Sequence, residues 1–162
     1  MSRQLGQSRD VPAPQRETTA YAADYFAWVQ DQVAAMKAGE LDRLDLENLA
    51  EELGDLANSA KREIASRLNV LLSHLLKWRF QPARRSNSWK ATIVEQRSRI
   101  LDELATSPCL KVYPAKVFGR EYEIARLKAS GETRLPENVF PQDCPFAIAD
   151  ILDPHFYPES DA

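Results

Sequence analysis

The chain has 162 residues, 44% hydrophobic and 28% charged, so it can bury a core and has the composition of a globular protein. A net charge of −3 and a pI near 5.5 argue against a dedicated nucleic-acid-binding protein, whose surface is usually basic. The N-terminus lacks the apolar segment of a signal peptide and no apolar run reaches roughly 20 residues, so we expect a cytoplasmic protein without a membrane span.

The chain is expected to begin with a flexible tail followed by one helix. Residues 1–17 are polar, contain prolines and have no periodicity, which predicts a tail outside the fold. Thr18 or Thr19 is expected to cap a helix over 19–38, and Gly39 to end it.

A second, much longer helix is predicted from Asp45 to about Phe80, where Pro82 ends it. Asp45 is a good N-cap residue, and the first turns are rich in carboxylates, which suit the positive end of the helix dipole. Apolar residues recur at spacings of three and four along the whole helix, which predicts one continuous packed seam. The residues of this seam are Leu46, Leu49, Leu53, Leu56, Ala60, Ile64, Leu68, Leu71, Leu75 and Trp78.

Two further helices are predicted, over 88–106 and 114–130, the second ended by Gly131. The connection before 88–106 is short, so this helix and 45–80 should form a long antiparallel hairpin. The remainder of the chain is rich in proline, with one short helix at 146–152, and is expected to wrap the outside.

The predicted fold is therefore a single-domain all-α helical bundle. We assign residues 18–158 to this domain and residues 159–162 to a C-terminal tail. The absence of a convincing two-residue period supports the all-helical prediction.

Charge is distributed unevenly along the chain. Residues 40–55 carry seven carboxylates and one base, whereas residues 77–99 carry seven bases and one acid. The carboxylates Glu47, Glu51 and Asp55 have a spacing that can converge on a metal ion, but they lie opposite the leucine seam. We therefore expect them to face water, and expect Glu52, on the flank of the seam, to be partly buried.

His74 is one of two histidines and lies at the edge of the seam. The hairpin register places it near Gln96 and Arg97 on the facing helix. A structural hydrogen-bond network is the favoured interpretation, with a catalytic or ligand-binding cluster of His74, Gln96 and Arg97 as the alternative. We predict neither a metal site nor a cofactor, because the chain contains no complete set of metal ligands and no nucleotide-binding motif.

The turn at 77–90 combines bases with tryptophans, and its candidate residues for binding nucleic acid or an anion are Lys77, Arg84, Arg85, Trp89 and Lys90. Arginine beside aromatic rings can contact phosphates and stack on bases. Two other interpretations stay open, a charged cap at the end of the bundle and a surface for a protein partner. The two tryptophans of this turn fall on apolar helix faces, which favours the cap.

Several short segments are informative in combination: Tyr25-Phe26-Ala27-Trp28, Leu46-Glu47-Asn48-Leu49-Ala50-Glu51-Glu52-Leu53, His74-Leu75-Leu76-Lys77-Trp78, Arg85-Ser86-Asn87-Ser88-Trp89, Glu95-Gln96-Arg97, Cys144-Pro145-Phe146 and Leu152-Asp153-Pro154. Together they resemble a bacterial family of domains of unknown function, number twenty-nine (DUF29), over about Tyr21 to Pro158. The resemblance implies a compact, mainly helical bundle. It provides no activity, cofactor or catalytic residue to transfer to this chain.

The leading functional hypothesis is a non-catalytic interaction or scaffolding module that binds a protein partner or a second copy of itself. The uneven charge and the absence of a complete catalytic constellation motivate it. The first alternative is a nucleic-acid-associated protein that uses the turn at 77–90. The second alternative is an enzyme or ligand-binding protein built around His74. The two cysteines, Cys109 and Cys144, are expected to be free thiols.

Overall fold

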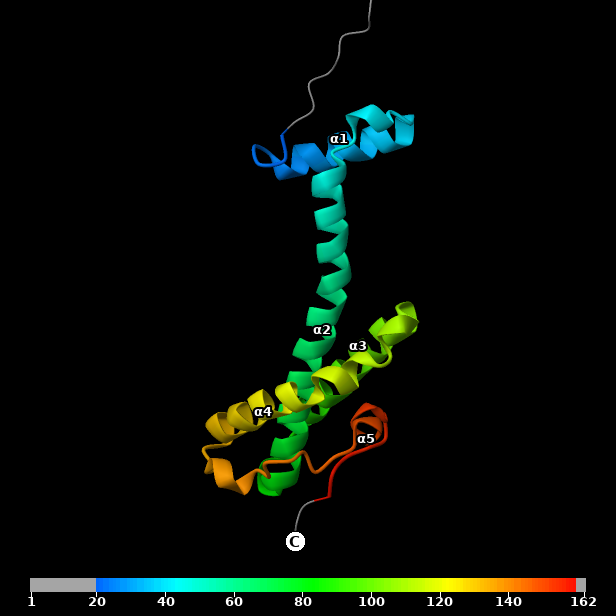
Figure 1. Ribbon diagram of the computed structural model, residues 1–162. Coiled ribbons are helices and arrows are strands. Elements are labelled where there is room, and N and C mark those ends of the chain that lie inside the picture. Colours follow the sequence, from blue (N-terminus) through cyan, green and yellow to red (C-terminus); the bar gives the residue numbers. More distant parts are fainter. Residues whose placement is uncertain (1–19, 160–162) are drawn as a thin grey trace, which may run out of the picture. The chain divides into compact units, whose positions relative to one another are not determined.

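The computed structural model describes residues 20–159, and every regular element in this range is helical. The five α-helices are α1 (Tyr25–Ala38), α2 (Leu46–Phe80), α3 (Asn87–Thr106), α4 (Tyr113–Thr133) and α5 (Ile148–Leu152), and short 3₁₀ helices fall in the connections (Figure 1). The all-α prediction is therefore confirmed. The predicted tail at 1–17 and most of the tail at 159–162 lie outside the described residues. No helix in the described part is both long and apolar enough to cross a membrane.

The described residues group into two compact units, and the boundary between Leu53 and Gly54 falls inside α2. The first unit contains α1 and the start of α2. The second contains the rest of α2 with α3, α4 and α5. The assignment of 18–158 to a single domain stays a prediction, because compact units that share a helix can still unfold as one.

The first unit differs from the prediction in where its helix begins. Helix α1 starts at Tyr25, six residues after the expected start, because the Asp24 carboxylate accepts a hydrogen bond from the Ala27 N–H at 3.0 Å and caps the helix. Gly39 ends α1 as predicted, in the left-handed conformation at φ 74°, and its N–H bonds back to Ala35 and Met36. The sequence alone does not show which of several neighbouring Thr and Asp residues caps the helix, because both residue types are favoured at the N-cap.

Helix α2 has the predicted bounds within one residue. Asp45 accepts from the Asn48 N–H at 3.3 Å, which confirms its role as the N-cap. The other end of α2 is followed by Pro82 and a short turn. Ser86 then caps α3, with its hydroxyl oxygen accepting from the Trp89 N–H at 3.2 Å. The predicted antiparallel hairpin of α2 and α3 is therefore confirmed.

Helix α4 continues past its predicted end. Gly131 lies inside the helix, and Arg134 adopts the left-handed conformation at φ 61° instead. The Arg134 N–H closes the last turn on Ser130 at 2.8 Å, and the Thr133 hydroxyl donates to the Ala129 carbonyl at 2.6 Å. A glycine inside a helix costs only about 1 kcal/mol, which the surrounding packing can offset. Gly131 was therefore wrongly predicted as the stop.

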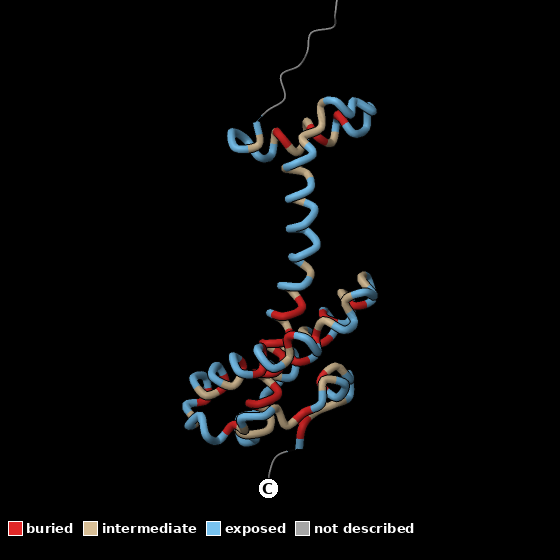
Figure 2. The backbone as a smooth tube through the Cα atoms, in the orientation of Figure 1, coloured by how far each residue is buried: buried red, intermediate tan, exposed pale blue. Residues whose placement is uncertain are grey.

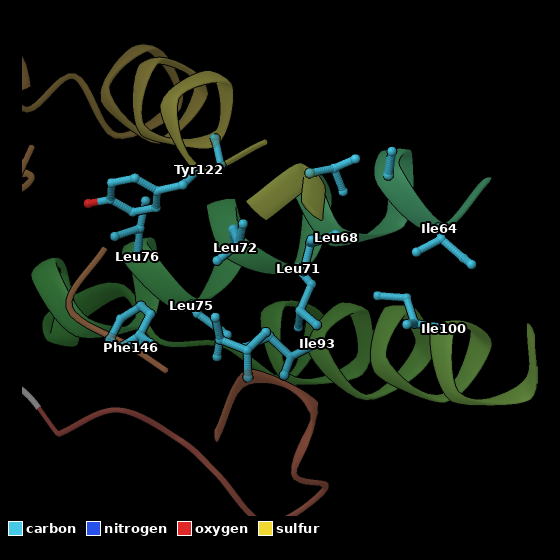
Figure 3. Close-up of a cluster of buried hydrophobic side chains, with 14 of the residues drawn as sticks. Ile64, Leu68, Leu71, Leu72, Leu75, Leu76, Ile93, Ile100, Tyr122 and Phe146 are labelled. Atoms are coloured by element: carbon cyan, nitrogen blue, oxygen red, sulfur yellow. The ribbon is translucent and has the colours of Figure 1, made fainter. Parts of the chain in front are cut away.

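The core of the second unit lies where α2, α3 and α4 meet the C-terminal segment. Figure 3 shows leucines of α2 with Ile93 and Ile100 of α3, Tyr122 of α4 and Phe146 of the segment before α5. Phe140 and Ile151, at 1% and 0% exposed, extend the core into the C-terminal segment. The proline-rich end of the chain therefore packs on the bundle as predicted.

The predicted seam of α2 is buried only in its second half, from Ile64 onward. Figure 2 shows the first half of the helix largely exposed. Helix α2 has 35 residues and a length of about 52 Å, whereas α3 has 20 residues and spans about 30 Å. Running back from the turn, α3 can cover α2 only as far as about Ile64. The prediction that helices cover the whole seam was therefore wrong.

Candidate functional site

An exposed apolar surface lies on the first half of α2. Leu46, Leu53 and Leu56 are 68%, 65% and 67% exposed, and Leu49 and Ala60 are half-buried. Spacings of three and four alternate through these five residues, so a helix places them on one face in a coiled-coil pattern. We call this set the leucine stripe. Contiguous exposed leucines are uncommon on a surface that contacts only water, and they mark sites of association.

The carboxylates at the start of α2 lie away from the stripe. Glu47, Glu51 and Asp55 are all exposed, which confirms the expectation that they face water. Within the described residues, no group of three or more His, Cys, Asp or Glu side chains is arranged to hold a metal ion. These carboxylates therefore act on their surroundings as a local negative charge at the positive end of the helix dipole.

Glu52 is half-buried, as expected, and joins α1 to α2. The hydroxyl groups of Tyr21 and Tyr25 donate to its two carboxylate oxygens at 2.6 and 2.8 Å. The hydrogen bond to Glu52 is the largest cause that raises the pKa of Tyr21 to about 12, and the same two bonds lower the pKa of Glu52. Glu52 is therefore ionised near neutral pH, and both of its carboxylate oxygens accept hydrogen bonds from tyrosines of its own chain.

A second set of contacts fixes α1 at the N-terminus of α2. The Trp28 indole N–H donates to Asp45 Oδ2 at 3.2 Å, and the Asp45 N–H donates to Gln32 Oε1 at 2.8 Å. Trp28 and Gln32 are 2% and 1% exposed. The Asn48 side-chain amide also donates to Asp45, and this bond is the first cause of the lowered pKa of Asp45. These hydrogen bonds therefore fix the N-terminal end of α2, where the leucine stripe begins.

His74 is half-buried, and its partners lie on its own helix. Its Nδ1 lies 2.9 Å from the Val70 carbonyl and its Nε2 lies 3.3 Å from Lys77 Nζ. Lys77 in turn forms an ion pair with Glu132 at 2.5 Å. Burial, followed by the Lys77 charge, lowers the pKa of His74 despite the opposing effect of the Val70 bond. The neutral ring, donating from Nδ1 and accepting at Nε2, fits both contacts.

The structure does not bring His74, Gln96 and Arg97 together as one cluster. Gln96 accepts a hydrogen bond from Arg67 at 3.1 Å. Arg97 is 2% exposed, and its guanidinium donates to three carbonyls of the C-terminal segment, at Ile151, Pro154 and Phe156, over 2.8 to 3.2 Å. Sequence reasoning missed this arrangement because backbone carbonyls carry no residue signature.

The side chains of the basic turn are largely placed over aromatic rings. Lys77, 4% exposed, lies 5.0 Å from the centre of the Trp89 ring. Arg85 donates to the Trp78 carbonyl at 2.8 Å and lies 5.1 Å from the Trp78 ring. Lys90 lies 5.9 Å from the Tyr157 ring, and Arg84 is exposed. Cation–π contacts of this kind stabilise the end of the hairpin.

An open pocket of about 640 Å³ lies between α4 and the segment that follows it, and no pattern in the sequence predicts it. Its lining includes Phe118, Tyr122, Arg126, Asp143 and Cys144. Burial raises the pKa of Tyr122 to about 12 and that of Cys144 to about 11, so both groups are protonated near neutral pH. A protonated thiol is a poor nucleophile. Cys144 and Cys109 are both free, as predicted.

A comparison with models of protein families identifies the family of this chain. The family model described as a domain of unknown function, DUF29, matches residues 20–157, which includes the leucine stripe and the whole helical hairpin. No curated protein and no solved structure matches the chain. The match covers most of the sequence and agrees with the resemblance of its short segments. The chain therefore belongs to the DUF29 family.

Proposed function

We propose that this protein is a non-catalytic interaction module that binds an amphipathic helix of a partner along the leucine stripe. The exposure of Leu46, Leu53 and Leu56 is the observation that carries the proposal. A partner helix with apolar residues at the same spacing can bury these leucines by knobs-into-holes packing. Each of these leucines, moved from water into such a contact, contributes about 1–2 kcal/mol of hydrophobic free energy, from which the entropy cost of association is subtracted.

The hydrogen bonds that hold the N-terminal end of α2 support this function. An isolated helix as short as the exposed stretch of α2, residues 46–60, is marginal in water, and ordering it on binding would reduce affinity. Here the contacts of Glu52 with Tyr21 and Tyr25, and of Asp45 with Trp28, hold the helix end before any partner arrives. A preformed recognition helix keeps more of the contact energy as affinity.

The polar groups of the second unit support a role without catalysis. His74, Lys77 and Glu132 satisfy one another and a backbone carbonyl, and Arg97 is committed to the C-terminal segment. Such closed networks stabilise a fold and leave little hydrogen-bonding capacity for a substrate.

Nucleic-acid binding through the basic turn has less support, because Lys77 is buried and Arg85 and Lys90 lie over rings of the same chain. A low-salt titration with single- and double-stranded oligonucleotides tests this alternative. It predicts binding that weakens steeply with salt, with a smaller salt dependence in Arg84→Ala.

Site-specific photo-cross-linking in native cells tests the proposed function. A photoreactive amino acid is placed at Leu53 or Leu56, with Leu127 of α4, 47% exposed, as the matched control. We expect a cross-linked protein adduct at positions 53 and 56 and none at 127. Absence of an adduct at both stripe positions, or the same adduct at all three, would contradict the proposal.

A further inference from the structure

We infer, building on the proposed function, that the partner helix is α2 of a second copy of this chain, paired antiparallel along the leucine stripe. The inference rests on the order of apolar residues, on the net charges of the two halves of α2 and on the small residues at one edge of the stripe.

The inner part of the stripe, from Leu49 to Ala60, is complementary to itself when one copy is reversed. In an antiparallel pair centred between residues 54 and 55, Leu53 of each copy lies opposite Leu56 of the other, and Leu49 lies opposite Ala60. These pairs form because the spacings of three and four alternate symmetrically about this centre. The exposed leucines at 53 and 56 thus form the middle of the interface, where water is excluded most completely.

The charges along α2 select the antiparallel orientation. Residues 46–56 contain four carboxylates and no base, whereas residues 57–67 contain three bases and one acid. Antiparallel pairing brings each acidic half to the level of the basic half of the other copy, which lowers the electrostatic cost of bringing the two helices together. Parallel pairing would place the two acidic halves at the same level, and repulsion between them opposes association.

Small residues border the stripe and permit close approach of two helices. Ala50 and Ala57 are exposed and lie beside Leu46 and Leu53 on the helix surface. Ser59 borders the other edge, and Glu52 on that edge is held by the tyrosines of its own chain. The edge formed by Ala50 and Ala57 therefore presents no bulky side chain and no charge to the second helix.

The size of the surface sets the expected affinity. Residues 46–60 extend about 22 Å along the helix, which gives an interface at the small end of specific protein contacts. A dimer with a dissociation constant of about 1–100 µM is therefore expected, with an equilibrium that depends on protein concentration.

Sedimentation equilibrium on the full-length protein tests the dimer. We expect a monomer–dimer equilibrium for the natural sequence and for the control Leu127→Glu, and a dissociation constant raised at least about tenfold for Leu53→Glu/Leu56→Glu. A monomer at several hundred micromolar, or a dimer unaffected by the double substitution, would overturn the inference. A circular dichroism spectrum matching that of the natural protein shows that the variant is folded.

Cross-link mapping tests the orientation. A photoreactive amino acid at Leu46, in a mixture of isotopically light and heavy protein, should give intermolecular links that map near Arg62–Ile64 of the other copy. Links near residues 44–50 would indicate a parallel pair and overturn the inference. If the purified protein is a monomer while positions 53 and 56 still give adducts with another protein in cells, the inference fails and the proposed function stands. If neither is seen, both fail.

Discussion

Arg97 has a role at the residue scale that its position on a helix does not reveal. Its guanidinium is 2% exposed and donates to the carbonyls of Ile151, Pro154 and Phe156, residues more than fifty positions away in the chain. Its planar fork of donors suits three acceptors that point in different directions, and the Tyr157 ring lies 5.7 Å away. The side chain therefore attaches the C-terminal segment to α3.

Replacement of Arg97 tests this attachment. In Arg97→Met the three carbonyls lose their donors while the volume is roughly kept, so we expect a loss of about 2–4 kcal/mol in the free energy of unfolding. Arg97→Lys should recover only a part, because an ammonium group cannot reproduce the fork. The exposed Arg99→Met is the control, expected within about 0.5 kcal/mol of the natural protein in urea unfolding. An equal effect of both methionine substitutions would contradict the proposed role.

The bonds of Glu52 with Tyr21 and Tyr25 predict a pH dependence. The pKa of Tyr21 is raised from 10.0 to about 12, so its contribution to stability is present below pH 10 and is lost as the pH rises to about 12. The pKa of Glu52 is lowered from 4.5, so its contribution is present above that pH and is lost as the pH falls through the folded-state pKa.

Substitution of Glu52 makes the effect measurable. In Glu52→Gln the hydrogen bonds from the two hydroxyl groups lose their charged acceptor and the negative charge that opposes phenolate formation is gone, so the pKa values of Tyr21 and Tyr25 should fall toward 10. Ultraviolet phenolate absorbance, followed against pH in both proteins, should show more tyrosine ionised near pH 10 in the variant. Identical titration curves would show that the carboxylate does not perturb these tyrosines.

At the element scale, the sequence predicts a helix end, and the hairpin that follows from it, where a single residue determines that end. Asp45, Pro82 and Gly39 mark their helix ends because caps and breakers act locally. Which part of the seam is buried could not be predicted from the sequence, because burial of Leu53 or Leu56 depends on how far a neighbouring helix extends. The partners of Gln96 and Arg97 were missed for a similar reason, because tertiary contacts chose among several acceptors.

The glycines of the first two helices predict opposite effects of the same substitution. Gly54 lies inside α2 with open space around an added Cβ, so Gly54→Ala should raise the free energy of unfolding by about 0.5–1 kcal/mol. Gly39 has φ 74°, so Gly39→Ala should lower it by about 1 kcal/mol. Urea unfolding of both variants checks the pair. Destabilisation by Gly54→Ala would indicate a neighbour that this structure does not contain.

At the scale of the whole molecule, the two units bury very different amounts of apolar surface. In the described part of the first unit, Trp28 and Ala35 are the buried apolar residues, whereas the second unit contains the cluster of leucines, isoleucines and aromatics around α2. The first unit is held by polar contacts of Glu52 and Asp45 and by ring contacts among Tyr21, Tyr25 and Trp28. Apolar residues that a core would normally use therefore remain on its surface, which is the expected distribution for a surface used in recognition.

Urea unfolding of Leu53→Glu/Leu56→Glu at low protein concentration tests most directly whether the stripe serves recognition and not folding. The two leucines are 65% and 67% exposed, and glutamate is as good a helix former, so we expect a free energy of unfolding within about 0.5 kcal/mol of the natural protein. Leu72→Ala, at a position 0% exposed, should lose about 2–5 kcal/mol in the same assay. A loss of 2 kcal/mol or more in the double variant would place the stripe in the folded core and contradict the account.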